Sequence, residues 1–245
     1  INTNDFKRTD EIKRGILSLY KDDIAKNEEK ALLIKGIFDD IPSQLSKHEK
    51  RFIYSKVRNK AKLRDMSKPF TWLKESMIVN ICYKALEPNF GLKMNLESVA
   101  LKCYMGDTGL LLIHAFDEKG LLDNEIYRRL LFDKLSINKG MLTENIVAQM
   151  LVSSNHKLYY YANSSRQNKD DRMGIDFLVA KSKLTNKHNI SPIEVKSSKY
   201  NTRRSLDKFK NKYSDFIDKA YVLDPSDVRI ENDIIYLLLY MTPFI

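Results

Sequence analysis

The chain has 245 residues, which is enough for one large domain or two small ones. Hydrophobic residues make up 43% and charged residues 30%, and only 8 Gly and 6 Pro occur, so the composition predicts a globular protein and excludes collagen-like or low-complexity character. The longest nearly apolar stretch, Ile234 to Ile245, is too short to cross a bilayer. Cys82 and Cys103 form neither a disulfide framework nor a C-x-x-C pair, so we expect both to be buried thiols of a cytoplasmic protein. Because no apolar stretch is long enough to span a bilayer, we expect no membrane partner.

The net charge of +10 is concentrated in two segments. Lys47 to Lys68 holds nine basic residues and two acids, and Lys181 to Lys212 holds ten basic residues and two acids. The rest of the chain is mildly acidic. Two such blocks predict a nucleic-acid partner, because lysine and arginine side chains that neutralise phosphates release counterions and dominate the affinity. Two solvated helical faces are the alternative that the charges alone leave open.

The first half of the chain has the apolar spacing of helices. Three helices are predicted, over Glu11 to Asp40, around the basic stretch from Phe52 to Val57, and from Ser67 to Ala85. Pro42 is expected to end the first of them. An extended piece, Gly91 to Tyr104, follows. This order is compatible with a small winged-helix-like module, although many helical bundles share it.

The second half alternates short apolar runs with polar linkers. The predicted elements are a helix over Met141 to Val152, strands over Leu158 to Tyr161, Ile175 to Ala180 and Ile190 to Lys196, a basic helix over Arg204 to Phe216, and strands over Ala220 to Leu223 and Ile234 to Tyr240. An early hairpin followed by a helical crossover predicts an α/β fold with a mixed sheet and helices packed on it.

Signatures of several enzyme classes are absent from the sequence. There is no G-x-x-x-x-G-K-[ST] phosphate loop, no G-x-G-x-x-G, no G-x-S-x-G and no H-E-x-x-H. We therefore expect no ATP hydrolysis by this fragment. The four histidines lack metal-ligand spacing and are predicted to be ordinary surface or core residues: His48, His114, His156 and His188.

Charged residues interrupt apolar strands at Asp176, Glu194 and Lys196. Because side chains alternate across a strand, Glu194 and Lys196 share one face, about 7 Å apart along it. If the two strands pair, one register brings Asp176 into the same cluster. Glu144 lies at the edge of the apolar arc of the preceding helix and is predicted to point along the sheet.

Three acids and a lysine are the groups that magnesium-dependent phosphodiester hydrolysis requires. Carboxylate oxygens are hard ligands for the ion, and the compact charge of a lysine can orient water and stabilise the phosphate. We predict that Glu144, Asp176 and Glu194 bind Mg²⁺ or Mn²⁺ and that Lys196 assists the attacking water. The alternative is an ion-pair network that only satisfies a polar pocket.

The pattern D…E-x-K across two strands, preceded by a helix that carries Glu, resembles the core of the PD-(D/E)XK nucleases. The wider sequence resembles the C-terminal domain of unknown function that follows the ATPase module in a family of bacterial and archaeal AAA-type ATPases. The matching segments keep the order of that family and cover most of the chain: 20–24, 104–111, 140–145, 158–161, 175–179 and 192–196.

The resemblance implies a nuclease-like α/β domain, of restriction-endonuclease type, behind a winged-helix-like domain. Residues 1–35 would be the helical tail of an upstream ATPase module, 36–105 the winged-helix-like domain and 106–245 the nuclease-like domain. DNA and the ATPase module of the same parent chain would be the partners, and ATP would bind only to that module. Glu144, Asp176, Glu194 and Lys196 fall on the motif positions, while Gly174 and Ile175 replace the motif proline.

The basic helix after the E-x-K strand is predicted to contact phosphate through Lys199, Arg203, Arg204 and Lys208. Two rival functions remain open from the sequence: a non-catalytic module of the same fold that binds DNA or regulates the ATPase, and a module whose basic blocks bind acidic proteins.

Two further motifs have ordinary readings. Asp107, flanked by Gly106 and Gly109, is interpreted as a turn rather than an acidic site. Tyr159 to Tyr161 is interpreted as sheet packing rather than a base-stacking platform.

Overall fold

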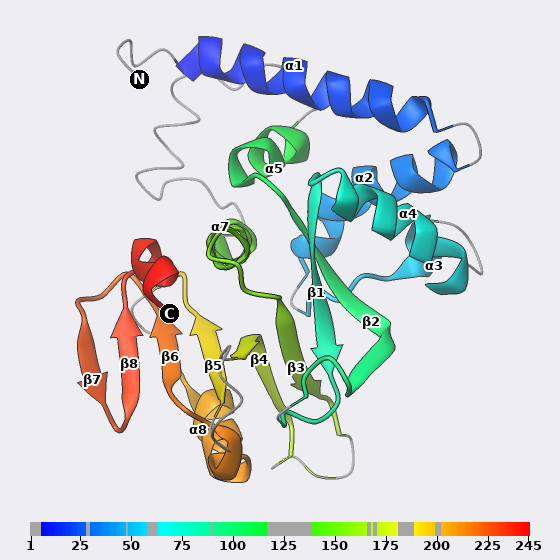
Figure 1. Cartoon of the computed structure of the whole chain (residues 1–245). Helices are drawn as coiled ribbons and strands as arrows, with labels where there is room; N and C mark the ends of the chain where they lie inside the picture. Colours follow the sequence, from blue (N-terminus) through cyan, green and yellow to red (C-terminus); the bar gives the residue numbers. More distant parts are fainter. Residues whose placement is uncertain are drawn as a thin grey trace. The chain divides into compact units, whose positions relative to one another are not determined.

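The computed structural model describes residues 6–27, 30–47, 49–57, 63–89, 91–116, 139–165, 168, 171–180, 189–198 and 202–245 (Figure 1). The chain divides into two compact units. Unit 1 comprises Ile1–Val79 and Cys103–Asn145, and unit 2 comprises Asn80–Lys102 and Ile146–Ile245. Each unit is described by itself.

Unit 1 is built from helices, with bounds α1 Phe6–Ala25, α2 Ala31–Leu45, α3 Tyr54–Val57, α4 Leu63–Glu75 and α5 Thr108–Ala115. The central helix is α2, which packs against the other four. Its buried face is formed by Ile34, Ile37, Phe38 and Ile41, the one-sided spacing of an amphipathic helix. The helix α7 (Lys139–Ser153) begins in unit 1 and ends in unit 2.

The predicted single helix over Glu11 to Asp40 is wrong, because α1 and α2 are separate helices. Pro42 does not end the run, since it lies inside α2. A proline has no N–H for the carbonyl four residues earlier, which here belongs to Phe38. His114 supplies the missing donor, because its Nε2 lies 2.9 Å from the Phe38 carbonyl oxygen and its ring stacks on the Phe38 ring.

The predicted helix from Ser67 to Ala85 is also wrong in its second half. The helix α4 begins at Leu63 and ends at Glu75, and β1 (Val79–Ala85) follows it. Met77 has a φ of 57°, and the Ile78 amide donates to the Leu73 carbonyl at 3.0 Å. This left-handed residue and its hydrogen bonds form a Schellman C-cap that turns the chain from helix into strand.

An eight-stranded mixed sheet combines two strands from the first half of the chain with six from the second half. The strands are β1, β2 Leu96–Met105, β3 Tyr159–Asn163, β4 Met173–Ala180, β5 Ile190–Val195, β6 Ala220–Leu223, β7 Arg229–Glu231 and β8 Ile234–Leu237. Their order is β2-β1-β3-β4-β5-β6-β8-β7. The pairs β1–β3, β5–β6 and β6–β8 are parallel, and β3–β4, β4–β5 and β7–β8 are antiparallel. The prediction of an α/β fold with a mixed sheet flanked by helices is therefore confirmed. The winged-helix-like module and the domain boundaries at residues 35 and 105 stay predictions.

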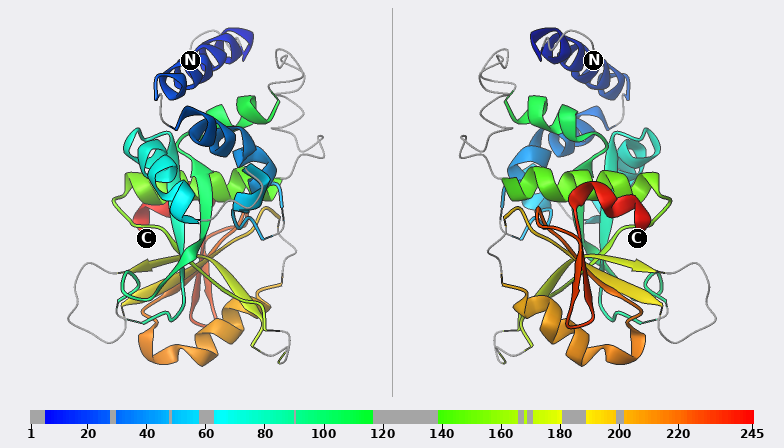
Figure 2. Two further views of the ribbon diagram at one scale, coloured as in Figure 1. Left: turned by 90° about the vertical axis from the view of Figure 1, so that its right-hand side faces the viewer. Right: turned by 90° about the vertical axis from the view of Figure 1, so that its left-hand side faces the viewer.

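The helix α8 (Arg204–Lys212) lies against the sheet of unit 2 (Figures 1 and 2). Its buried Leu206 and Phe209 pack in a core cluster with Tyr161 and Val222. Two 3₁₀ segments, η2 (Ser214–Phe216) and η3 (Leu239–Phe244), complete the C-terminal part.

The interpretation of Tyr159 to Tyr161 as sheet packing is confirmed, whereas Asp107 begins a helix and does not lie in a turn. The Asp107 carboxylate caps α5 by accepting from the Leu110 amide at 2.7 Å. All three tyrosines of the run Tyr159 to Tyr161 are buried in the sheet. Cys82 and Cys103 are buried free thiols, as predicted, and burial raises the pKa of Cys103. Among the described helices, none is both long and apolar enough to cross a membrane.

Candidate functional site

Glu194 is a buried carboxylate in the middle of the sheet of unit 2. It lies on β5 beside the fully buried Ile193, and only 6% of its surface is exposed. Lys196 Nζ donates to Glu194 Oε1 at 2.5 Å. The second oxygen, Oε2, is buried and has no hydrogen-bond partner among the described residues. One carboxylate oxygen is therefore left for a ligand from outside the described chain.

The register of the sheet explains why Glu194 is buried. Glu194 pairs with Val222 of the parallel neighbour β6, and Val222 belongs to the core cluster that α8 covers. Burial raises the pKa of Glu194, Lys196 opposes that rise, and the charges of Asp176 and Asp207 add to it. The carboxylate is thus short of positive charge, which is the condition under which a carboxylate takes up a proton or a metal ion.

Asp176 lies close to Glu194, and its two carboxylate oxygens have partners of their own. Its Oδ2 accepts from the Val195 amide at 2.9 Å, and its Oδ1 lies 3.9 Å from Lys102 Nζ. The antiparallel register that pairs Phe177 with Ile193 and Leu178 with Pro192 places Asp176 directly opposite Glu194 on the neighbouring strand. A bulge in the β3–β4 pairing, between Tyr159 and Tyr161, falls at this part of β4 and interrupts regular alternation.

Lys102 is a site residue that the sequence analysis missed. It lies on β2, is 6% exposed, and its Nζ lies 5.1 Å from the centre of the Tyr160 ring. A charged residue inside the run Ala100 to Tyr104 is the same signal that identified Asp176 and Glu194. It could have been found by applying that rule to every strand.

Glu144 is held by partners within unit 1. Its carboxylate forms an ion pair with Lys50 and accepts from the Tyr104 hydroxyl at 3.0 Å, and both residues are buried. Asp176, Glu194 and Lys196 belong to unit 2. Within the part of the chain that the structure describes, no group of three His, Cys, Asp or Glu side chains is placed to hold a metal ion.

Asp176 and Glu194 are two adjacent carboxylates of the kind that a divalent cation needs. Magnesium needs hard oxygen ligands and is commonly held by one or two carboxylates, with water and substrate phosphate completing its shell. The unpaired Oε2 of buried Glu194 and the adjacent carboxylate of Asp176 supply such a pair. Lys196 lies beside them, on the Glu194 side.

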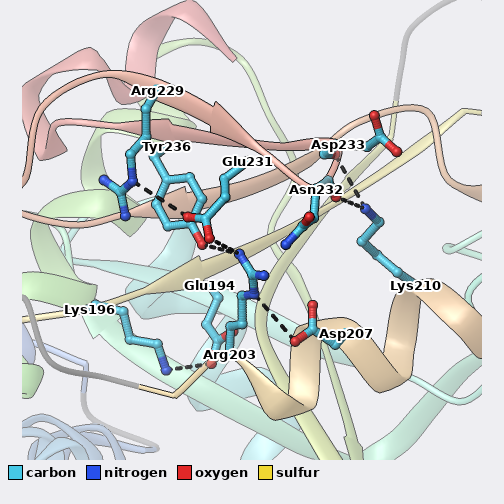
Figure 3. A network of polar contacts seen from close by, with 10 residues as sticks. All are labelled: Glu194, Lys196, Arg203, Asp207, Lys210, Arg229, Glu231, Asn232, Asp233 and Tyr236. Carbon is cyan, nitrogen blue, oxygen red and sulfur yellow. Dashed lines mark hydrogen bonds and ion pairs between the residues drawn. The ribbon is translucent and has the colours of Figure 1, made fainter.

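A pocket of about 320 Å³ opens next to Lys196. It is lined by Lys196, Ser198, Thr202, Arg203, Val222, Asp224, Arg229, Glu231 and Tyr236. Figure 3 shows that Arg203, which immediately precedes α8, contacts residues from two strands and from that helix. Its guanidinium donates to the Tyr236 hydroxyl at 2.7 Å and lies 3.5 Å from Glu231 and 3.4 Å from Asp207. The hydrogen bond to Tyr236 is the main reason why the pKa of Arg203 is raised.

The predicted phosphate-contacting residues have different positions. Lys199 lies outside the described residues. Arg203 lines the pocket, Arg204 is exposed on α8, and Lys208 is half-buried. Lys212, further along the same helix, forms an ion pair with Asp171 at 2.8 Å. Part of the positive charge of α8 is therefore neutralised by an acid of the same chain.

Comparisons with known proteins give matches to two family models. Residues 139–242 match a domain of unknown function (DUF4143), and residues 1–119 match another domain of unknown function (DUF8612). The first match contains Asp176, Glu194 and Lys196. No curated protein and no solved structure matches the chain. The resemblance of the C-terminal part to a domain of unknown function is confirmed.

Proposed function

We propose that this chain acts on DNA as a metal-dependent phosphodiester hydrolase, with a PD-(D/E)XK-like core formed by β3, β4, β5, α8 and β6. Asp176 and Glu194 would hold Mg²⁺ or Mn²⁺, and Lys196 would orient the attacking water. The resemblance also supports the further proposal that the chain is the C-terminal module of an AAA-type ATPase, whose own module binds ATP.

The buried, half-satisfied carboxylate of Glu194 is the observation that carries the proposal. An ionised carboxylate removed from water costs several kcal/mol unless a cation or hydrogen bonds compensate it. Lys196 serves only Oε1, while Oε2 has no partner among the described residues. The nearby charge of Asp176 makes the deficit larger. A divalent cation held by both carboxylates would satisfy them together.

The chain's own residues would divide the chemistry as follows. A bound Mg²⁺ supplies Lewis-acid character and lowers the pKa of water. Lys196, whose Nζ lies 2.5 Å from Glu194 Oε1, is placed to turn toward a water or a phosphate oxygen beside that carboxylate. Asp176 is oriented by the Val195 amide, so its second oxygen stays directed away from the β5 backbone.

A nicking assay on supercoiled DNA tests the proposal. Wild type should cleave with Mg²⁺ or Mn²⁺ and not with EDTA. Asp176→Asn and Glu194→Gln should each lower the rate by about 100-fold or more, since each removes a ligand charge. Asp215→Asn removes an exposed acid of the same unit and should keep the wild-type rate.

Metal binding is measured separately, by the loss of the free Mn²⁺ signal in electron paramagnetic resonance. Wild type and Asp215→Asn should bind, and Glu194→Gln should bind at least about tenfold more weakly. Identical cleavage ladders for wild type and Asp176→Asn would reject the catalytic proposal.

A second candidate function is a non-catalytic module of the same fold that binds DNA or regulates the ATPase. The ion pair between Glu144 and Lys50 within unit 1 favours this candidate, because one of the four motif residues then has a structural partner. Salt-sensitive DNA binding in wild type, Asp176→Asn and Glu194→Gln alike, without cleavage by any of them, would support this candidate.

A further inference from the structure

We propose that unit 1 carries a separate phosphate-binding pocket for a nucleic-acid strand, formed where the chain leaves α2 and enters α3. The pocket has a volume of about 660 Å³. It is lined by Lys47, Glu49, Lys50, Arg51, Phe52, Ile53, Tyr54 and Ser55. The choice of nucleic acid as the ligand rests on the proposed function.

Lys47 lines this pocket, and its ammonium is held by the buried Gln44. Burial lowers the pKa of Lys47, and contact with the Lys56 ammonium lowers it further, against the opposing charge of Asp40. Lys56 is exposed on α3, one residue beyond the pocket-lining Ser55. Two like charges held side by side are stabilised by an anion between them. A phosphate group, with several oxygens, can accept from both ammonium groups at once.

The loop that carries Lys47 is held in place by a buried amide. Gln44 is 1% exposed, and its Oε1 accepts from Lys47 Nζ at 2.5 Å and from the Ile53 amide at 3.3 Å. Its Nε2 contacts Asp40 and the Ile53 carbonyl. Both ends of the loop are therefore tied to one side chain. The lysine is fixed before a ligand arrives, which reduces the entropy lost on binding.

Aromatic packing fixes the other wall of the pocket. Phe52 is buried, and its ring packs edge-on against Phe70 with 5.1 Å between centroids. Tyr54 packs against both rings, at 5.9 Å from Phe52 and 6.1 Å from Phe70. Arg51, between the two lysines in sequence, is exposed. The pocket thus combines a rigid wall with cations that face solvent.

The charge of the pocket is positive after internal pairs are removed. Lys50 is compensated by Glu144, which lies in the same unit. Lys47 and Arg51 in the lining, with Lys56 just beyond it, then outnumber Glu49 and Asp40. A strand phosphate is favoured over a small carboxylate ligand because the sequence segment Lys47 to Lys68 holds nine basic residues and only two acids.

The test measures DNA binding by fluorescence polarisation in EDTA, so that hydrolysis plays no part. The logarithm of the association constant is followed against the logarithm of the salt concentration. Each phosphate that a protein neutralises contributes about 0.9 to that slope. The double variant Lys47→Gln, Lys56→Gln should lower the slope by about 1, since both lysines hold one phosphate. Each single variant should lower it by no more than that.

Lys35→Gln is the matched control, because Lys35 is an exposed lysine of the same unit that pairs with Asp39. It removes one positive charge, as each single variant does, and should leave the slope unchanged. Lys47→Arg should keep the wild-type slope, and circular dichroism confirms that each variant is folded. A slope in the double variant equal to that of Lys35→Gln overturns the site, as does a wild type that binds no DNA.

Competition with polyglutamate and with inorganic phosphate separates the ligands. Phosphate should compete at the pocket, so that its effect is weaker in the double variant. Displacement by polyglutamate at lower concentrations than DNA would overturn the proposal in favour of an acidic protein. A slope change without any nicking would leave this site standing and reject only the hydrolase.

Discussion

A buried glutamate in a β-strand has to be compensated, and Glu194 is compensated on one oxygen only. Lys196 contacts Oε1, and burial still outweighs that contact in raising the pKa of Glu194. Such an arrangement is unfavourable for folding and useful for binding a cation. The free energy of unfolding should therefore depend on whether Glu194 is charged.

Replacing Glu194 by Gln should stabilise the protein at neutral pH. The folded state holds the Glu194 proton more tightly than the unfolded chain, whose carboxyl titrates near the ordinary value of 4.5. The free energy of unfolding of wild type therefore falls as the pH rises above that value. Glu194→Gln removes this loss, so its midpoint in urea should exceed that of wild type at pH 7.

The advantage should vanish below about pH 4.5, where the carboxyl is protonated in both states. The control is Glu75→Gln at an exposed position of α4, which should follow wild type at every pH. A Glu194→Gln protein that is less stable than wild type at pH 7 would show that the Lys196 ion pair outweighs burial. The measurement is urea unfolding in the absence of divalent ions.

At the residue scale, the sequence predicted what depends on strand alternation. Glu194 and Lys196 interact because residues two apart share a face. Asp176 lies opposite Glu194 because of the register between β4 and β5, and that register has no signature in the run Gly174 to Val179. Lys50, the partner of Glu144, lies 94 residues away in sequence. Neither pattern nor spacing can predict such a contact, because it depends on tertiary packing.

At the element scale, the predicted boundaries of the helices depended on whether the residue that ends each helix could be recognised in the sequence. The apolar positions of the segment from Trp72 to Ile81 fit both a helix and a strand, so periodicity cannot place the boundary. Glycine or asparagine usually marks a Schellman cap, and Asn155 marks the one after α7, with a φ of 65°. At the end of α4 the same position is Met77. The signal was missing there, and the prediction extended the helix too far.

Replacing Met77 by Gly should stabilise the protein by up to about 1 kcal/mol. A residue with a side chain pays roughly 1 to 2 kcal/mol to adopt the left-handed conformation. Glycine adopts it without that cost but loses more entropy on folding, which offsets part of the gain. Met77 is 82% exposed, so little packing is lost. Thermal unfolding followed by circular dichroism measures the change.

The matched control is Met94→Gly, because Met94 is 87% exposed and has no positive φ. That substitution should be neutral or slightly destabilising. If Met77→Gly lowers the melting temperature as much as Met94→Gly, the φ of Met77 does not cost free energy, and the C-cap assignment is wrong.

At the scale of the whole molecule, units and sequence segments do not coincide. The chain passes between the units at Val79, at Lys102 and at Asn145. The segment Asn80–Lys102 comes from the first half of the sequence and belongs to unit 2. The family match over residues 139–242 therefore does not include β1 and β2, two strands of the sheet. Sequence order alone predicts contiguous domains and cannot predict this exchange.

The fragment 139–245 should consequently fold poorly alone. In the whole chain β1 covers the edge of β3, with Tyr83 beside Tyr159, and the buried Ala85 and Leu92 close the core. Removing this segment exposes an unpaired strand edge and buried tyrosines, a combination that promotes aggregation. Size-exclusion chromatography and dye binding should reveal aggregates or exposed apolar surface.

Joining residues 79–105 to this fragment through a flexible linker should restore a monomer with cooperative unfolding. The same linked protein with Tyr83→Pro is the control, because proline removes the Tyr83 amide that donates to the Leu158 carbonyl at 3.1 Å. It should behave like the unlinked fragment. If 139–245 is already monomeric and melts at the temperature of the linked protein, β1 and β2 add nothing to unit 2, and the matched region is a complete domain.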